Sequence, residues 1–198
     1  TAFGSIKNVG EIFRAMGPLV LIALGFAIAS RAGFFNVGLP GQALAGWIAA
    51  VWFALSFQDI PRILMIPLTV LVAAISGGFV GLIPGILRAF LGTSEVIVTI
   101  MMNYIVLFAG NEIIRNFPKN FMVDSESSIT VGANASYRLG FLTELTKSRM
   151  NIGIFIALIA VAVVWFIIKK TTLGFEIRSV GLNPNASDYA GMSAKRII

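Results

Sequence analysis

The sequence predicts an all-α integral membrane protein, a polytopic helical bundle with about five spans and one broken helix near Asn36 to Gln42. Three observations predict this class. The mean hydropathy is +0.89. Hydrophobic residues make up 57% of the chain and charged residues only 12%, whereas about a quarter of the residues in soluble domains are charged. Apolar runs recur at lengths close to those that a helix needs to cross a bilayer, and no soluble domain interrupts them.

The composition also excludes most familiar chemistry. The chain contains neither cysteine nor histidine, which removes thiolate nucleophiles, imidazole bases and the usual zinc ligands. We therefore assign no catalytic residue and no metal ligand. The net charge is +6, but the basic residues are scattered singly or in pairs along loops and span ends. This distribution is typical of charges at a membrane boundary and does not indicate a nucleic-acid partner.

Five apolar segments are expected to span the membrane. They cover about residues 15–29, 34–57, 63–87, 96–114 and 152–168. The third contains a face of small residues suited to close helix packing. Residues 115–151 form the one long polar connection and are predicted to be a small extramembrane subdomain, in which the run SSITVGANASYRLGFL could pair as strands or form short helices. The chain opens on Thr1 and stops within a polar stretch, so we expect it to be a fragment.

The stretch RAGFFNVGLPGQ, residues 31–42, separates the first two apolar runs. It combines polar side chains with glycines and a proline, and the runs beside it leave little room for a loop. One interpretation is a discontinuous helix whose free backbone groups face protein or a water-filled path. The alternative is a tight turn between two antiparallel spans.

The fourth apolar segment carries a polar stripe. Glu95, Thr99 and Asn103 are spaced four residues apart, so they share one face of a helix. The stripe could line a passage for a polar solute. Alternatively, Asn103 could bond to a neighbouring helix.

The last apolar segment is followed by KKTTLGFEIRSVGLNPNASDYAGMSAKR. Asn183 is a good helix N-cap, Pro184 suits the first helical position, and Gly191 can adopt the left-handed conformation that ends a helix. These residues predict a helix of about two turns. It would lie on a membrane face where a soluble partner can reach it; the alternative is an ordinary solvated loop with a helical turn. Lysine and arginine counts on the two sides are equal and give no orientation.

Three segments resemble a known family. RAGFFNVGLPGQALAGWIAAVW, EVIVTIMMNY and TTLGFEIRSVGLNPNASDYAGMSAKR are similar, in the same order, to motifs of bacterial ABC importer permeases for nucleosides. The wider superfamily includes permeases for simple sugars and branched-chain amino acids. The resemblance covers about residues 30–198. One departure is Pro40, which stands where these relatives usually carry a glutamate, and it puts any role of that carboxylate in doubt.

The resemblance implies that residues 1–198 are part of an ABC permease transmembrane domain, roughly the middle half of a subunit. Residues 171–198 would be a cytoplasmic coupling segment that docks on an ATP-binding subunit, and residues 115–151 would lie outside. The residues expected to carry the coupling are Gly181, Asn183, Pro184, Ala186, Tyr189 and Gly191.

The implied function is a permease subunit of an ABC importer for nucleosides in the bacterial cell membrane, working by alternating access. Its implied partners are a separate ATPase subunit that binds ATP and Mg²⁺, a second permease subunit, and an extracytoplasmic solute-binding lipoprotein. No cofactor of its own is implied. The residues expected to line the solute path are Phe35, Asn36, Gln42, Thr99 and Asn103, with Phe34 or Phe35 available to stack on a base.

Two other classes fit parts of the sequence. An ion-coupled secondary transporter of a small polar solute would titrate Glu95 or Glu112 and would need no docking surface. A membrane enzyme would have to use Lys119, Asp124 and Glu126, which show no recognisable spacing. The docking-type segment favours the ABC permease over both.

Overall fold

The chain folds into two compact units, which are described separately. The computed structural model describes residues 5–124, 127–128, 130–137 and 151–197, so Glu126 and residues 138–150 of the long connection lie outside the description. The first unit, called the α1–α6 unit, combines Thr1–Phe34 with Tyr137–Ile198. The second, called the α2–α4 unit, is Phe35–Ser136.

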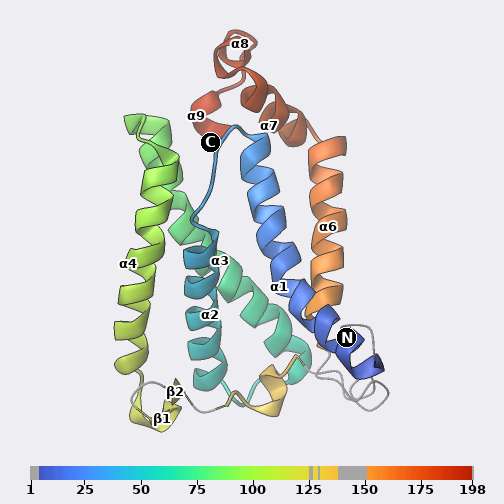
Figure 1. Cartoon of the computed structure of the whole chain (residues 1–198), viewed down its shortest axis with the longest axis vertical. Coiled ribbons are helices and arrows are strands. Elements are labelled where there is room, and N and C mark those ends of the chain that lie inside the picture. Colours follow the sequence, from blue (N-terminus) through green and yellow to red (C-terminus); the bar gives the residue numbers. More distant parts are fainter. Residues whose placement is uncertain (1–4, 125–126, 129, 138–150, 198) are drawn as a thin grey trace. The chain divides into compact units, whose positions relative to one another are not determined.

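Within the described residues, five helices are long and apolar enough to cross a membrane. They are α1 (Ile6–Arg31), α2 (Leu39–Ser56), α3 (Arg62–Leu91), α4 (Glu95–Arg115) and α6 (Gly153–Lys170), shown in Figure 1. The predicted class and number of spans are confirmed. Many large apolar side chains along these helices are exposed in the isolated chain, which is expected of surfaces that face lipid or further protein.

The helix ends differ from the expected apolar runs. Helix α1 begins at Ile6, well before the run that starts at residue 15, because Ser5 caps it by accepting a hydrogen bond from the Asn8 N–H at 3.3 Å. Helix α2 begins only at Leu39, although the apolar run starts at Phe34. Hydropathy locates the apolar part of a helix, whereas capping and backbone geometry decide where the helix starts.

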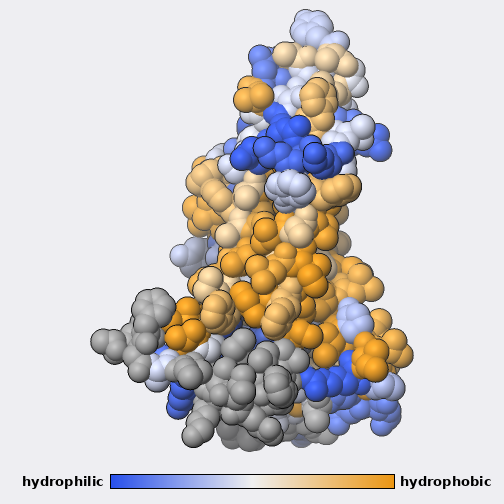
Figure 2. All heavy atoms as spheres, turned by 90° about the vertical axis from the view of Figure 1, so that its right-hand side faces the viewer, coloured by the Kyte–Doolittle hydropathy of each residue, from blue (hydrophilic) through white to orange (hydrophobic). Residues whose placement is uncertain are grey.

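In the α1–α6 unit, α1 packs along α6 (Figure 1). A Cβ atom on Gly17 would lie 3.1 Å from the carbonyl carbon of Gly153, so the glycine allows the two backbones to approach closely. The outer side of this pair is an apolar band, with hydrophilic residues above it where the chain leaves α6 (Figure 2). Lys169 and Lys170 end the helix and are exposed.

A further helix, α7 (Thr172–Leu182), follows α6 directly and was not predicted. Thr171 makes the corner: its hydroxyl donates to the Ile167 carbonyl at 2.6 Å and accepts from the Gly174 N–H at 3.1 Å. Helix α8 (Pro184–Tyr189) comes next, with the N-cap and glycine stop that the sequence predicts, and α9 (Ala194–Ile197) ends the described chain. The short helix expected in this stretch is therefore present, with six residues, and its contact with a soluble partner stays a prediction.

In the α2–α4 unit, α2 contacts both α3 and α4. A Cβ atom on Gly46 would lie 2.9 Å from the Ala73 carbonyl oxygen of α3. Beside it, the Ser76 hydroxyl donates to the Ala45 carbonyl at 3.1 Å. The small-residue face predicted on α3 also turns toward α2, because a Cβ on Gly77 would lie 3.0 Å from the Gln42 carbonyl oxygen. Small residues therefore set the close spacing of these helices.

The described part of the connection after α4 folds against the ends of α2 and α3. It contains η1 (Lys119–Phe121), β1 (Met122–Asp124), β2 (Ser127–Ser128) and η2 (Ala133–Ala135), with β1 and β2 antiparallel. Phe117 and Phe121 are buried against Ile48 and Leu55 of α2. The Asn134 amide donates to the Gln58 and Ile60 carbonyls at 2.7 and 3.0 Å. The run SSITVGANASYRLGFL was expected to form strands or short helices, and its described part contains both, the strand β2 and the short helix η2.

Candidate functional site

The chain is not helical between α1 and α2. Helix α1 ends at Arg31, and residues 32–38 form a turn followed by an extended segment (Figure 1). In the turn, Gly33 has φ +76°, its N–H donates to the Ser30 carbonyl at 3.2 Å, and the Phe34 N–H donates to the Ala29 carbonyl at 3.0 Å. This is a Schellman stop. Because α1 and α2 are each long enough to cross a membrane, the interruption lies between two candidate spans and not inside one.

Side chains of α4 satisfy the backbone of the extended segment. The Val37 N–H donates to Thr99 Oγ1 at 3.3 Å, and Asn103 Nδ2 donates to the Val37 carbonyl at 3.1 Å. Asn103 Oδ1 also accepts from the Gly41 N–H at 2.9 Å. One amide thus serves as donor and acceptor at the same time, as the asparagine side chain permits. The arrangement matters because a backbone group that is buried without a hydrogen-bond partner is costly.

Asn36 starts helix α2 from within the segment. Its Oδ1 accepts from the Gly38 N–H at 2.8 Å, and Gln42 Nε2 lies 3.5 Å from the same oxygen. This local bond is the turn that asparagine commonly makes with its own backbone. Pro40 sits in the first turn of α2, where its missing N–H leaves no gap in the helix.

Two glycines bring the segment close to α4. A Cβ atom on Gly41 would lie 2.9 Å from Asn103 Oδ1, and one on Gly38 would lie 3.1 Å from the Thr99 Cβ. Real Cβ atoms essentially never come within 3.0 Å of a non-bonded atom, so a larger residue at position 41 would displace the Asn103 amide that holds the segment.

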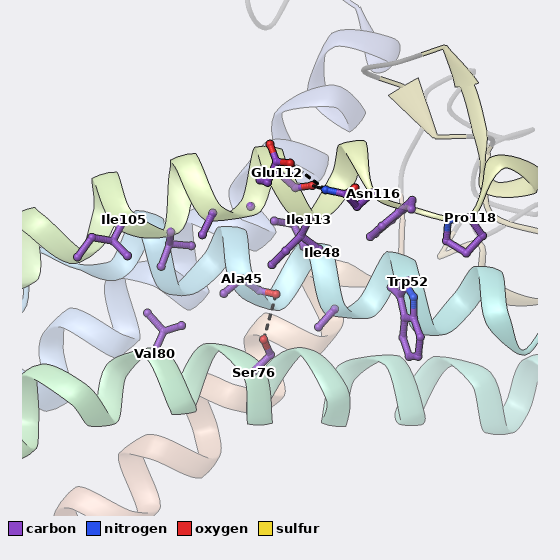
Figure 3. A pocket seen from close by; sticks show the side chains of 15 residues that line it. Ala45, Ile48, Trp52, Ser76, Val80, Ile105, Glu112, Ile113, Asn116 and Pro118 are labelled. Carbon is purple, nitrogen blue, oxygen red and sulfur yellow. Dashed lines mark hydrogen bonds between the residues drawn. The ribbon is translucent and has the colours of Figure 1, made fainter.

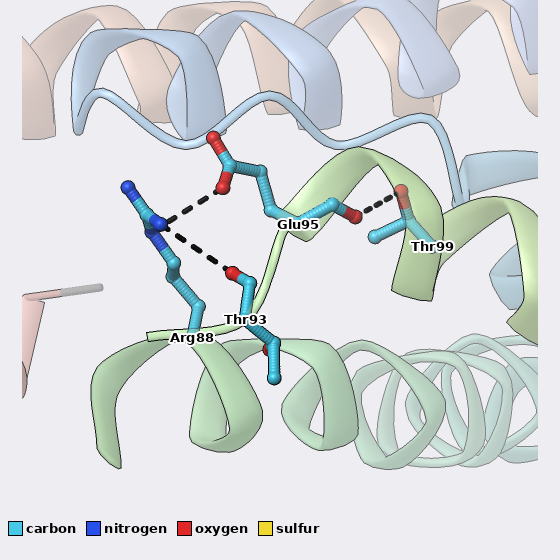
Figure 4. A network of polar contacts seen from close by, with 4 residues as sticks. All are labelled: Arg88, Thr93, Glu95 and Thr99. Atoms are coloured by element: carbon cyan, nitrogen blue, oxygen red, sulfur yellow. Dashed lines mark hydrogen bonds and ion pairs between the residues drawn. The ribbon is translucent and has the colours of Figure 1, made fainter. Parts of the chain in front are cut away.

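An ion pair closes the turn between α3 and α4 beside Thr99. Arg88 Nε lies 3.2 Å from Glu95 Oε2, and Arg88 Nη1 donates to the Thr93 carbonyl at 3.4 Å (Figure 4). The Thr99 hydroxyl lies 2.7 Å from the Glu95 carbonyl, to which it donates. Thr99 is completely buried. Its hydroxyl therefore connects the first turn of α4 to the extended segment.

The structure brings together four of the five residues predicted to line the path. Asn36, Gln42, Thr99 and Asn103 form one polar cluster, and Phe35 precedes it with half of its surface exposed. Asn103 bonds to a neighbouring segment, which is one of the two alternatives considered for it; a role in lining the path stays a prediction. The sequence reasoning missed the backbone partners Val37, Gly38 and Gly41. The four-residue spacing of Thr99 and Asn103 indicated that this helix face needs polar partners, but it did not indicate which residues supply them.

A separate groove of about 850 Å³ runs between α2, α3 and α4 (Figure 3). It is almost entirely apolar, and its polar lining residues are Ser76, Glu112 and Asn116. The Asn116 amide donates to Glu112 Oε1 at 2.9 Å. The predicted path residues do not line it. The groove is therefore an apolar helix surface and a poor match for a polar solute.

Helix α8 is a short exposed projection. The Asn183 Oδ1 accepts from the Ala186 N–H at 3.1 Å. At the other end Gly191, with φ +83°, donates to the Asp188 carbonyl at 3.0 Å, and the Met192 N–H donates to the Ser187 carbonyl at 2.9 Å. Both ends are thus fixed by capping.

The outer surface of α8 and its flank is partly apolar. Tyr189 is 96% exposed and Leu182 is 87% exposed. Pro184 and Ala186 are exposed as well, whereas Ser187 is buried. A rigid projection with exposed apolar side chains is suited to a protein contact. Within the described part of the chain, no three acidic side chains come together in a way that could hold a metal ion.

Comparison with known proteins identifies the family. Residues 8–198 match the family described as "Branched-chain amino acid transport system / permease component". The chain belongs to this family. As a permease component it is a multi-pass protein of the cell membrane and carries neither an ATPase site nor a cofactor, so these expectations are confirmed. No solved structure matches it significantly.

Several curated relatives are similar along nearly the whole chain. The nucleoside ABC transporter permease protein NupB of Lactococcus lactis is 55% identical, over all of this chain and 56% of the relative. The guanosine ABC transporter permease protein NupP of Bacillus subtilis is 47% identical, over 99% of this chain and 56% of the relative. The glucose ABC transporter permease protein TsgB13 of Haloferax volcanii is 30% identical, over 92% of this chain and 50% of the relative. The chain spans about half the length of these relatives.

The Asn103 contacts generate a prediction about backbone protection. Replacing Asn103 with leucine leaves the Gly41 N–H and the Val37 carbonyl without partners. Since a net hydrogen bond contributes about 1 kcal/mol, amide exchange at Gly41 should accelerate about fivefold to tenfold. Hydrogen exchange read by mass spectrometry on the purified protein measures this. Asn116→Leu, which removes an amide bonded within its own helix turn, should leave Gly41 unchanged. Equal exchange in both variants would contradict the assigned contact.

Proposed function

We propose that the chain forms the central part of a nucleoside permease in an ABC importer. The single observation that carries the proposal is the match to NupB and NupP along essentially the whole chain. The polar cluster of the α2–α4 unit supports it chemically, because amide groups can both donate to and accept from a base or a ribose. The proposed partners are an ATP-binding subunit that holds ATP and Mg²⁺, a second permease subunit and an external solute-binding lipoprotein.

The proposed solute path runs past Asn36, Gln42, Thr99 and Asn103. The first two are only partly buried in the unit, and exposed Phe35 beside them offers a ring for stacking on a base. Thr99 and Asn103 would hold the extended segment in place while its neighbours contact the solute. Weak contacts suffice, since a permease must release what the binding protein delivers.

Helix α8 is the proposed docking element for the ATP-binding subunit. It follows a span that ends in two exposed lysines, and its capped ends make it rigid. If α8 is cytoplasmic, counting spans backwards puts the connection after α4 outside and both the α3–α4 turn and the C-terminal end of α1 inside. The contact of α7 with the end of α1 supports this count, because both must then lie on the same face.

An ion-coupled transporter is the second candidate, and the carboxylates give it less support. Glu95 is paired with Arg88, and Glu112 accepts a hydrogen bond from Asn116 at the end of α4. A coupling carboxylate usually faces the interior of a bundle or a water-filled cavity. Exposed Tyr189 on a rigid projection favours a docking partner instead.

The proposal predicts that transport depends on ATP and not on an ion gradient. Uptake of labelled guanosine by the complete complex in energised vesicles should keep most of its initial rate when a protonophore is added and internal ATP is maintained. The measurement is the initial rate of uptake with and without the protonophore. Collapse of uptake while ATP stays constant would establish the ion-coupled alternative.

A second prediction concerns docking. Ala186→Glu places a bulky charge on the exposed face of α8 and should release the ATP-binding subunit, lowering its recovery with the permease at least fivefold. The subunit should still insert, because the site lies outside the candidate spans. Gln58→Glu adds the same charge at an exposed position between α2 and α3 and should leave recovery unchanged. Wild-type recovery and solute-stimulated hydrolysis in Ala186→Glu would remove α8 as the docking element.

A further inference from the structure

Helix α7 rests on the C-terminal end of α1 through a contact between backbones. A Cβ atom on Gly181 would overlap the Arg31 carbonyl oxygen and would lie 2.9 Å from the carbonyl carbon of the same residue. It would also lie 3.1 Å from the Gly33 nitrogen. Only glycine fits at position 181, so the last turn of α7 touches the stop of α1 without any side chain between them.

The other side of this contact is also a glycine. Gly33 has φ +76°, and a Cβ atom there would lie 3.3 Å from Gly181 Cα. The Schellman bonds at Gly33 and Phe34 fix the backbone of this turn. Two backbones thus meet where neither has a flexible side chain that could yield, and a displacement of one must move the other.

Side-chain packing also holds α7 against the ends of α1 and α6. Ala32, next to Gly33, is buried in one apolar cluster with Ile168 of α6 and Ile177 of α7. Val180 is completely buried. The α6–α7 corner is equally tight, because a Cβ on Gly174 would overlap the Ile167 carbonyl oxygen. The end of α1, the end of α6 and α7 therefore behave as one rigid piece, and Asn183 joins it directly to α8.

Beyond this rigid piece, the chain continues from Phe34 into the extended segment that Thr99 and Asn103 hold on α4. The boundary between the two compact units falls at the same place, between Phe34 and Phe35. The chain therefore passes from the rigid piece to the α2–α4 unit through this one covalent link, a few residues before Asn36 and Gln42.

We propose that the Gly33–Gly181 contact transmits the docking movement of α8 to the extended segment, which makes Gly181 and Gly33 positioning residues for transport. This inference rests on the proposed function. It assigns to Gly181 a role in transmitting movement, separate from the docking surface at Ala186 and Tyr189. The role requires that α7 and the α1 stop keep their contact while the segment beyond Phe34 moves.

The test compares Gly181→Ala with Gly78→Ala in the complete complex. Both change a helical glycine, but a Cβ atom on Gly78 meets nothing within 4 Å. We expect Gly181→Ala to retain the ATP-binding subunit and to keep basal hydrolysis within about twofold, while the number of guanosine molecules taken up per ATP hydrolysed falls at least fivefold. Gly78→Ala should keep the wild-type ratio. A merely structural defect would instead lower hydrolysis and uptake together.

A second pair of variants tests the proposal if Gly181→Ala does not insert into the membrane. Gly33→Ala and Gly92→Ala place alanine at similar left-handed angles, φ +76° and +64°, but only the Gly33 Cβ has a neighbour within 4 Å. We expect the uptake ratio to fall with Gly33→Ala alone. If Gly181→Ala inserts and its ratio of uptake to hydrolysis is unchanged, the inference is overturned. If Gly181→Ala does not insert, an unchanged ratio in Gly33→Ala overturns it. Loss of the ATP-binding subunit from either variant also overturns it. A wild-type complex that takes up no guanosine would instead refute the proposed function.

Discussion

The structure depends on how one non-helical stretch of backbone obtains its hydrogen bonds. The segment between α1 and α2 must leave its peptide groups either to water or to protein, and in a membrane protein free groups are costly. Asn103 and Thr99 of α4 supply the bonds to Val37 and Gly41. This requirement explains why Gly38 ends the segment and Gly41 stands in the first turn of α2, because larger residues at these positions would push the backbone away from α4. It also explains the polar stripe within an apolar helix.

Close backbone approach recurs in both units with different consequences. In the α2–α4 unit, Gly41 lets a side chain of α4 bond to the backbone of α2. In the α1–α6 unit, Gly181 lets two backbones touch directly. The contact at Gly41 lets polar groups of α4 fix the start of α2. The contact at Gly181 joins α7, which leads to the proposed docking helix, to the C-terminal end of α1. Fold and proposed movement thus rest on the same property of glycine, the absence of a side chain at a contact.

The sequence predicted the features that depend on local chemistry. Five spans follow from apolar run length, and α8 follows from Asn183, Pro184 and Gly191, whose capping bonds appear as expected. Helix α7 was missed because its apolar residues are interrupted by charges, so hydropathy gave no sign of it. The Asn103 and Gly181 contacts could not be predicted, because they join residues that are far apart in the chain. The sequence pattern predicts which polar groups need a hydrogen-bond partner, but only the three-dimensional structure shows which partner each group has.

The central claim is that the extended segment adjoins the solute path. Single cysteines at positions 36 and 42, in a chain that has none of its own, measure it through their reaction with a small polar thiol reagent in the complete complex. We expect both to react, and to react more slowly when guanosine is present. A cysteine at Val161, within span α6, should stay unreactive. Unreactive cysteines at 36 and 42, or rates that guanosine does not change, would contradict the account.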